Sequence, residues 1–205
     1  MTEIEQLLEI VSNSKTKLNK FKYKRDETIS AFLPNRRQLC VVVEGSADLV
    51  RYDQNGNKNI IERFMEGDVF GEIFHSKVGV NELCVFASSN ATIIKLDYNN
   101  LVSQDFGEEN NAKLKKLFID IVLEKSIEQN IRIEILSKRT TRDKLLAYFN
   151  FLSNWKTRRV FTIPFSYTDL ADYLSVDRSA MTREIKNLEM EGFIKREGKR
   201  ITLRY

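Results

Sequence analysis

Five side chains with charged or hydrogen-bonding ends fall on one face of a predicted helix between Asp177 and Gly192. They are Arg178, Ser179, Thr182, Arg183 and Lys186. The planar fork of an arginine can donate to the O6 and N7 atoms of guanine together, and a short hydroxyl can reach a base edge or a phosphate. A lysine suits phosphates, which add affinity without sequence information. These residue types therefore predict a surface that binds double-stranded DNA in a sequence-dependent way.

The spacing of the apolar residues predicts that this polar face lies on the outside of a helix-turn-helix. Met181, Ile185 and Leu188 lie four and three residues apart, so they form an apolar stripe on the opposite face of the helix. A shorter predicted helix comes before it, capped by Ser166. Residues 175–176 form the short connection, and Asp177 is the predicted cap of the second helix. In such a pair, the second helix is the one that fits the major groove.

A basic hairpin follows the two helices. Phe193–Arg196 and Arg200–Leu203 are predicted strands, and residues 197–199 are the tight turn between them. The four basic residues of the hairpin suit phosphate contacts, namely Lys195, Arg196, Lys199 and Arg200. Helices and hairpin together predict a winged helix-turn-helix DNA-binding domain over residues 138–205.

The charge of the chain is divided unevenly along its length. Residues 138–205 contain 15 Lys and Arg against 8 Asp and Glu, whereas the whole chain contains 33 against 29. The net charge of +4 therefore hides a basic C-terminal part beside a slightly acidic remainder. This distribution is typical of a protein that binds nucleic acid through one domain.

The N-terminal half has the pattern of an antiparallel β-barrel or jelly roll. Its predicted strands are short β-rich runs separated by turn residues, namely Leu39–Val43, Ala47–Tyr52, Asn59–Phe64, Leu83–Ala87 and Ala91–Leu96. A short amphipathic helix with apolar residues at Ile4, Leu7, Leu8 and Val11 begins the chain. Residues 1–107 are accordingly predicted to form an effector domain, and the fold class to be α+β.

A long helix is predicted between the two domains, over residues 108–137. Residues 108–136 contain no glycine or proline, and a helix of about 29 residues is roughly 43 Å long. The apolar positions along it are Leu114, Leu117, Phe118, Ile121, Val122, Ile127, Ile131 and Ile135. One small barrel is too short to cover such a stripe, so the same helix of a second copy is the predicted cover.

With this order of domains the chain resembles the Crp/Fnr family of bacterial transcription regulators. The segments most similar to the family are Val43–Ala47 and Gly67–Glu72 in the predicted barrel and Val176–Glu189 in the helix-turn-helix. The resemblance implies a homodimer on a near-palindromic operator whose half-sites lie about 34 Å apart. RNA polymerase is a further partner that this role allows.

The resemblance also assigns roles to single residues. Arg178, Ser179 and Arg183 match the positions at which the family contacts bases. Many members have Glu where this chain has Ser179, so a different operator sequence is expected.

The family's best-known effector is a cyclic nucleotide held in the barrel by a Gly-Glu pair and a later Arg. Gly71 and Glu72 supply the pair, but Asn81 and Glu82 stand near the position of the Arg. Between Phe64 and Ile94 the only basic or potentially basic residues are His75 and Lys77. A buried phosphate without a cation costs several kcal/mol of desolvation. The sequence therefore predicts a regulator that is not controlled by cyclic nucleotide, and a cyclic-nucleotide- or haem-responsive regulator of the same fold is the alternative.

Other kinds of sensor require particular protein ligands, which can be compared with the residues present. An iron–sulfur cluster needs about four thiolates, and this chain has two cysteines, Cys40 and Cys84, both in apolar runs. Haem needs an axial ligand, for which His75 is the single histidine. Thiol sensing, an unidentified small molecule and constitutive binding stay open, so no cofactor and no metal are predicted and the effector is unknown.

The sequence gives no support for an enzyme or a membrane protein. One histidine cannot supply a convincing Ser/His/Asp arrangement, and neither a phosphate-binding loop nor an HExxH motif is present. No apolar run approaches the roughly 20 residues of a membrane span, and the N-terminus lacks the apolar region of a signal peptide. We therefore predict a cytoplasmic protein without catalytic residues.

Overall fold

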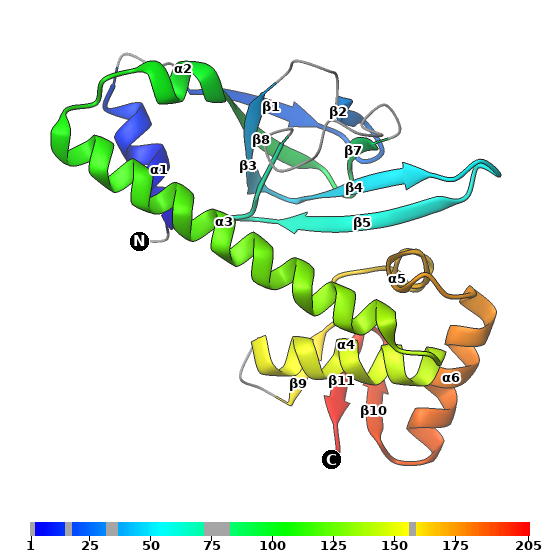
Figure 1. The fold of residues 1–205 in the computed structure, drawn as a ribbon. Coiled ribbons are helices and arrows are strands. Elements are labelled where there is room, and N and C mark those ends of the chain that lie inside the picture. The colour runs from blue at the N-terminus through cyan, green and yellow to red at the C-terminus, as the bar shows by residue number, and fades with distance from the viewer. Residues whose placement is uncertain (1–2, 15–17, 32–36, 72–82, 156–158) are drawn as a thin grey trace. The chain divides into compact units, whose positions relative to one another are not determined.

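The computed structural model describes residues 3–14, 18–31, 37–71, 83–155 and 159–205 (Figure 1). Contacts within the chain divide it into two compact units, Met1–Glu124 and Lys125–Tyr205. The boundary falls inside a single long helix, α3 (Glu108–Ser137). The functional division into residues 1–107, 108–137 and 138–205 stays a prediction.

The N-terminal unit contains two four-stranded antiparallel sheets, which confirm the predicted α+β fold with its β-rich first half. One sheet has the order β1-β8-β3-β6, with β1 at Asn19–Tyr23, β8 at Ala91–Asp97, β3 at Gln38–Glu44 and β6 at Val69–Phe70. The other has the order β2-β7-β4-β5, with β2 at Thr28–Ala31, β7 at Leu83–Ala87, β4 at Ser46–Tyr52 and β5 at Lys58–Met65. The five strands predicted from the sequence correspond to β3, β4, β5, β7 and β8.

Apolar side chains from both sheets form the core between them. Along β7, for example, buried Leu83, Val85 and Ala87 alternate with half-buried neighbours, as the two-residue period of a strand requires. Phe64 on β5 and Phe70 on β6 stack at 4.8 Å between ring centroids, and both are buried. The strand pattern in the sequence is therefore the pattern of this core.

Two glycines in this unit occupy positions that no other residue could fill without displacing backbone. Gly45 has φ +81°, and a Cβ there would lie 2.1 Å from the carbonyl oxygen of Asn90. Gly71 has φ +145°, and a Cβ there would lie 2.0 Å from the carbonyl oxygen of Gln38. Both glycines belong to the barrel segments that resemble the Crp/Fnr family, and in this chain each position has a steric requirement for glycine.

Three helices contribute to a second apolar cluster on the sheet that contains β3 and β8. They are α1 (Glu3–Ser12), α2 (Tyr98–Ser103) and the first half of α3. Leu7 of α1 and Leu101 of α2 are buried in this cluster with Leu114 of α3. Helix α2 was not predicted, although Asp97 caps it by accepting a hydrogen bond of 2.9 Å from the backbone N–H of Asn100.

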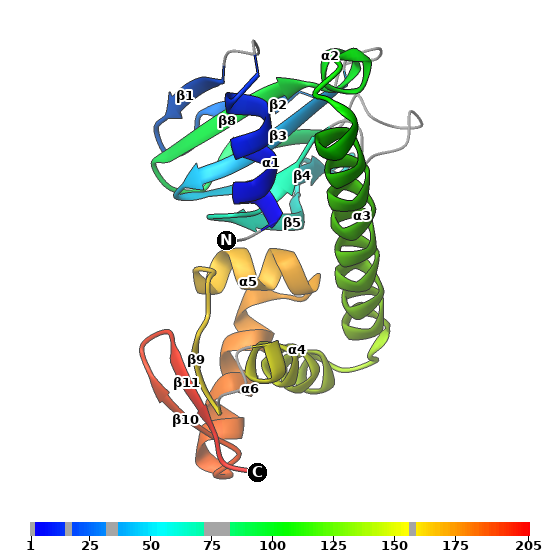
Figure 2. The ribbon, with the colours of Figure 1, turned by 90° about the vertical axis from the view of Figure 1, so that its left-hand side faces the viewer.

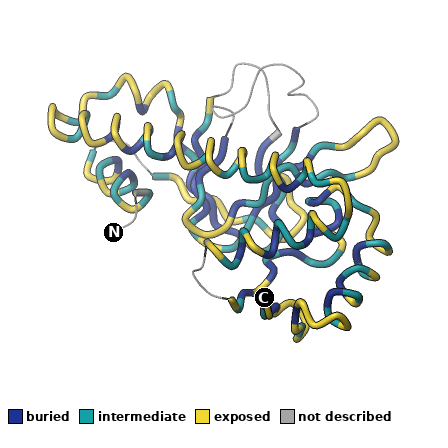
Figure 3. Tube along the Cα trace, turned by 60° about the horizontal axis from the view of Figure 1, so that its bottom comes forward, coloured by how far each residue is buried: buried dark blue, intermediate teal, exposed yellow. Residues whose placement is uncertain are grey.

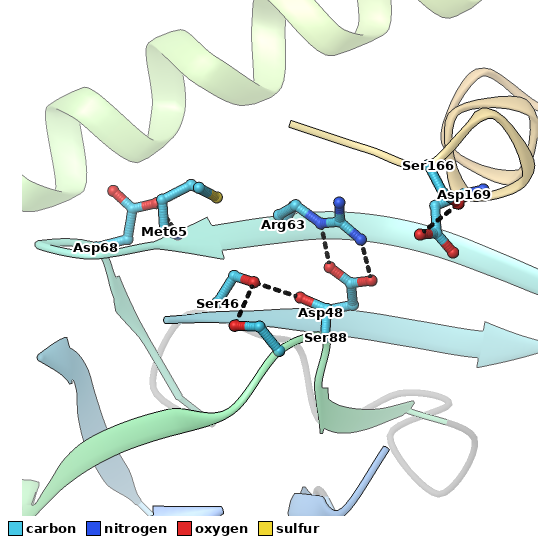
Figure 4. A network of polar contacts seen from close by, with 9 residues as sticks. Ser46, Asp48, Arg63, Met65, Asp68, Ser88, Ser166 and Asp169 are labelled. Atoms are coloured by element: carbon cyan, nitrogen blue, oxygen red, sulfur yellow. Dashed lines mark hydrogen bonds and ion pairs between the residues drawn. The ribbon is translucent and has the colours of Figure 1, made fainter. Parts of the chain in front are cut away.

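An ion pair joins the neighbouring strands β4 and β5 in the second sheet (Figure 4). The guanidinium of Arg63 donates from Nε and Nη2 to the two carboxylate oxygens of Asp48, at 2.6 and 2.7 Å. The side chains of Arg63 and Asp48 are only 7% and 3% exposed. A buried carboxylate is tolerated when an arginine satisfies it in this two-pronged way, so the pair supports the register of the two strands.

The long helix α3 turns one apolar face inward and leaves another exposed (Figure 3). Leu114, Leu117 and Ile121 are buried in the core of the N-terminal unit, and Ile135 is buried in the C-terminal unit. These four residues belong to the stripe predicted to face a second copy, and for them that prediction was wrong because the chain's own core covers them. Five other apolar side chains of the helix are more than half exposed, namely Ile119, Val122, Leu123, Ile127 and Ile133.

The C-terminal unit has the predicted winged helix-turn-helix order (Figure 2). Its helices and strands are α4 (Thr141–Trp155), β9 (Val160–Thr162), α5 (Tyr167–Leu174), α6 (Arg178–Met190), β10 (Ile194–Glu197) and β11 (Arg200–Leu203). The three strands form an antiparallel sheet in the order β10-β11-β9. An aromatic group around buried Tyr148 of α4, with Phe165 and Tyr173, fills the space between α4 and α5.

Candidate DNA-binding surface

The turn between α5 and α6 fixes how the second helix begins. Ser166 caps α5 by accepting a hydrogen bond of 3.1 Å from the backbone N–H of Asp169. Ser175 ends α5 in the left-handed conformation with φ 51°, an uncommon choice for a residue with a side chain. Asp177 then caps α6 by accepting a hydrogen bond of 2.8 Å from the backbone N–H of Ala180. Both caps were predicted from the sequence.

Helix α6 divides into a buried face and a polar face. Met181, Ile185 and Leu188 are buried, as their spacing predicted. Four of the five predicted DNA contacts on this helix are exposed, namely Arg178, Ser179, Arg183 and Lys186, and the fifth, Thr182, is half-buried. One helix therefore presents two guanidinium groups, two hydroxyls and an ammonium group away from the core.

Both hydroxyls at the start of α6 already make a hydrogen bond within the chain. The Oγ of Ser179 donates to Oδ1 of Asp177 at 2.6 Å, and Oγ1 of Thr182 donates to the backbone carbonyl of Arg178 at 2.8 Å. The pKa of the Asp177 carboxyl is lowered, first by the hydrogen bond from Ser179 and then by that from the N–H of Ala180. Asp177 is therefore ionised at neutral pH and can only accept hydrogen bonds.

The hairpin of β10 and β11 is tied to the first helix of the motif. The hydroxyl of Tyr167 on α5 donates to the carbonyl of Gly198 in the turn, at 2.7 Å. Gly198 has φ 62°, which suits the tight turn that Glu197 and Arg200 close as a cross-strand pair. Lys199 and Arg200 are both exposed at this turn. The structure thus brings two further basic residues to the tip of the wing, where they were predicted.

The other two basic residues of the wing are paired within the chain. Lys195 lies 2.7 Å from a carboxylate oxygen of Glu197, and Nε of Arg196 donates to Glu189 of α6 at 3.3 Å. The pKa of Glu197 is lowered mainly by its hydrogen bond from Lys195. Arg196 therefore links the wing to α6, whereas the Lys195–Glu197 pair is exposed and lies within β10, where such a pair adds little stability. Lys199 and Arg200 at the tip are better placed for phosphate contacts than these two residues.

One residue that positions α6 was missed by the sequence analysis. Arg142, at the start of α4, donates to Glu184 at 3.1 Å and to both carboxylate oxygens of Glu191. Its guanidinium also lies 5.1 Å from the centroid of the Phe193 ring. The hydrogen bond from Arg142 is the main cause of the lowered pKa of Glu191. Two glutamates seven residues apart on one face of a helix were the signal for such a clamp, but nothing in the sequence points to its arginine.

Of the predicted effector residues, only Gly71 belongs to the part of the chain that the structure describes. It lies within the second of the two barrel segments that resemble the family, and its backbone makes the close approach to Gln38 described above. Glu72, Asn81 and Glu82 lie outside the described residues, as do His75 and Lys77. The close backbone approach therefore explains Gly71. The lack of a cation for a bound phosphate is inferred from the sequence alone.

Neither a metal site nor a membrane-spanning helix is found among the described residues. Among them no three His, Cys, Asp or Glu side chains lie together in a way that could hold a metal ion. Within the same residues, no helix combines the length and the apolar character needed to cross a membrane. Cys40 is buried on β3, and Cys84 is half-buried on β7 in the other sheet.

Comparison with known proteins supports both halves of the architecture. The sequence profile of the cyclic nucleotide-binding domain matches residues 20–103, and that of the Crp-like helix-turn-helix domain matches residues 143–204. No curated protein sequence matches the chain.

Several solved structures share the fold over nearly the whole chain. FixK2 from Bradyrhizobium japonicum is 18% identical, with a TM-score of 0.72 over 92% of this chain and 93% of its own. A cyclic nucleotide-binding domain containing protein from Listeria monocytogenes is 14% identical, with a TM-score of 0.75 over 98% and 97%. The c-di-GMP responsive global regulator CLP from Xanthomonas campestris is 16% identical, with a TM-score of 0.67 over 99% and 98%. At these identities the similarity establishes the fold.

A cyclic nucleotide-binding-type domain joined by a long helix to a helix-turn-helix defines a class of DNA-binding transcription regulators. The chain belongs to the Crp/Fnr family of these regulators, as its sequence predicted. Members of this family regulate transcription and are not enzymes.

Proposed function

We propose that this regulator acts as a homodimer on a near-palindromic operator and that no cyclic nucleotide controls it. The observation that carries the DNA-binding part is the polar face of α6. Its basic and hydroxyl side chains are turned to solvent while the opposite face is buried in the domain core. In a helix-turn-helix the N-terminal part of the second helix contacts base edges.

The roles within the surface follow from the side-chain chemistry. Arg178 and Arg183 donate to guanine, Ser179 contacts a base, and Thr182 lines the same groove. Lys186 on the helix and Lys199 and Arg200 on the wing bind phosphates. The seven residues combine affinity from phosphates with specificity from base edges.

The proposed dimer forms through the exposed face of α3. Eight exposed residues recur at alternating spacings of four and three along this helix, and we call them the α3 seam: Ala112, Lys116, Ile119, Leu123, Ser126, Asn130, Ile133 and Ser137. This is the heptad spacing of a two-stranded coiled coil. Val122 and Ile127 flank the seam and are 53% and 56% exposed. A second copy of α3 would bury these apolar groups, and Asn130 would favour one register of the pair.

The proposal that cyclic nucleotide has no role gives a simple prediction for calorimetry. Titration of the purified protein with cyclic AMP or cyclic GMP is expected to show no binding in the micromolar range. The reason is that His75 and Lys77 are the only candidate cations between Phe64 and Ile94, and the position of the family's Arg falls near Asn81 and Glu82. Glu82 would also repel the phosphate. Micromolar binding of either nucleotide would overturn this part of the proposal.

The DNA-binding part is tested by selection of bound sequences from random duplexes. The selected sequences should share a near-palindrome, because a symmetric dimer presents the same surface twice. We propose that such a regulator works in the cytoplasm and has RNA polymerase as a further partner at a promoter.

A further inference from the structure

The two hydroxyls at the start of α6 have their hydrogens directed at groups that can only accept. Ser179 donates to the ionised carboxylate of Asp177 at 2.6 Å, and Thr182 donates to the carbonyl of Arg178 at 2.8 Å. A hydroxyl has one hydrogen and two lone pairs, so each of these oxygens has only acceptor capacity left. The two hydroxyls therefore differ from the arginines beside them, which can only donate.

This polarity limits which DNA groups Ser179 can bind. A phosphate oxygen is an acceptor, and so are O6 and N7 of guanine and O4 of thymine, and none of them has a hydrogen to offer. The donors in the major groove are the exocyclic amino groups, N4 of cytosine and N6 of adenine. Of the two hydroxyls, Ser179 is exposed and Thr182 is half-buried, so Ser179 is the better placed to meet an amino group.

We propose that Ser179 contacts a cytosine or an adenine of the operator and accepts a hydrogen bond from its exocyclic amino group. This inference rests on the proposed DNA-binding function and adds the chemistry of one contact to it. Asp177 is the positioning residue, because its carboxylate holds the Ser179 hydrogen away from the groove. The face of α6 then alternates donors at Arg178 and Arg183 with an acceptor at Ser179.

The test is a coupling experiment between protein and DNA on the operator that the wild-type protein selects. In each half-site, every cytosine is replaced in turn by pyrimidin-2-one and every adenine by purine, which removes only the amino group. At one base pair the wild-type protein should bind about 3- to 10-fold more weakly without the amino group, the value of one hydrogen bond. Ser179→Ala should be weaker by a similar factor on the intact operator and should lose less than about 2-fold more when that amino group is removed.

Two further variants separate this contact from a general effect on the domain. Ser103→Ala is the control: it removes an exposed serine hydroxyl on α2, which donates to the backbone carbonyl of Asn100, and it should behave as wild type. Asp177→Asn tests the positioning residue: it keeps an oxygen that can accept from Ser179 and from Ala180, so the amino-group dependence should persist.

Three results would overturn the inference. The first is that, at every base pair, the losses of affinity caused by Ser179→Ala and by amino-group removal multiply as independent effects do. The second is that the effect of Ser179→Ala is coupled to the effect of 7-deazaguanine or of a methylphosphonate, and not to the effect of removing an amino group. The third is wild-type binding that no amino-group removal weakens. If selection instead enriches no operator at all, the proposed function itself fails, and this contact fails with it.

Discussion

Replacing Leu123 and Ile127 together by glutamate is expected to convert the proposed dimer to a monomer. Both side chains are 56% exposed, one in the α3 seam and the other beside it. Because each side chain is already partly buried in one copy, its removal from a helix–helix contact forfeits about half of the full burial value, roughly 1–1.5 kcal/mol, and a dimer contains each group twice. The four introduced carboxylates would also repel one another across the interface. Light scattering should give the mass of one chain, 24.0 kDa, in place of twice that value.

The same variant should lose operator affinity, because a monomer cannot hold both half-sites at once. Linking two binding modules raises the overall affinity by about 10²–10⁴-fold, and this factor is what the variant should lose. Val102→Glu is the matched control, since Val102 on α2 is also 56% exposed but lies outside the seam. A glutamate variant of Leu123 and Ile127 that remains dimeric would show that the copies associate through another surface.

Arg183→Ala is the second substitution with a large expected effect. Arg183 is exposed on α6, one helical turn beyond Ser179, and its fork suits the O6 and N7 atoms of one guanine. Loss of such a pair costs about 1–3 kcal/mol of discrimination, so specific binding should fall about 5- to 150-fold. Preference should relax at one base position in each half-site. Quantitative mobility shifts on single-base operator variants measure both effects.

Lys186→Ala provides the comparison for a phosphate contact on the same helix. Lys186 is exposed one turn further along α6. Its loss should weaken binding to all sequences alike and reduce the salt slope by about 1. If Arg183→Ala instead gives the affinities and footprints of the wild-type protein, then α6 is not the helix that contacts the bases.

The sequence predicted the DNA-binding module well because its signals are local. Ser166 and Asp177 act within three residues of themselves, and the buried stripe of α6 follows from helical spacing alone. The barrel strands were found in the same way, from two-residue alternation between turns. Short segments with a strong pattern and a clear cap are those in which neighbouring residues decide the structure.

What the sequence could not show depends on contacts between distant residues. Leu117 and Ile119 are both apolar residues of one helix, but only the folded chain shows that the first is buried and the second exposed. Likewise, Arg142 meets Glu191 across 49 positions, and no local pattern records that contact. Periodicity identifies an apolar stripe without showing what covers it. For this reason the wrong apolar face of α3 was assigned to a partner.

Selection of bound duplexes from a random library shows whether two copies of this chain bind symmetric DNA through α6. We expect an enriched near-palindrome whose two half-sites are centred about one DNA turn, roughly 34 Å, apart. Each half-site should contain at least one guanine whose replacement affects the wild-type protein but not Arg183→Ala. A library that yields no enriched sequence, or a single half-site without a symmetric partner, would contradict the account.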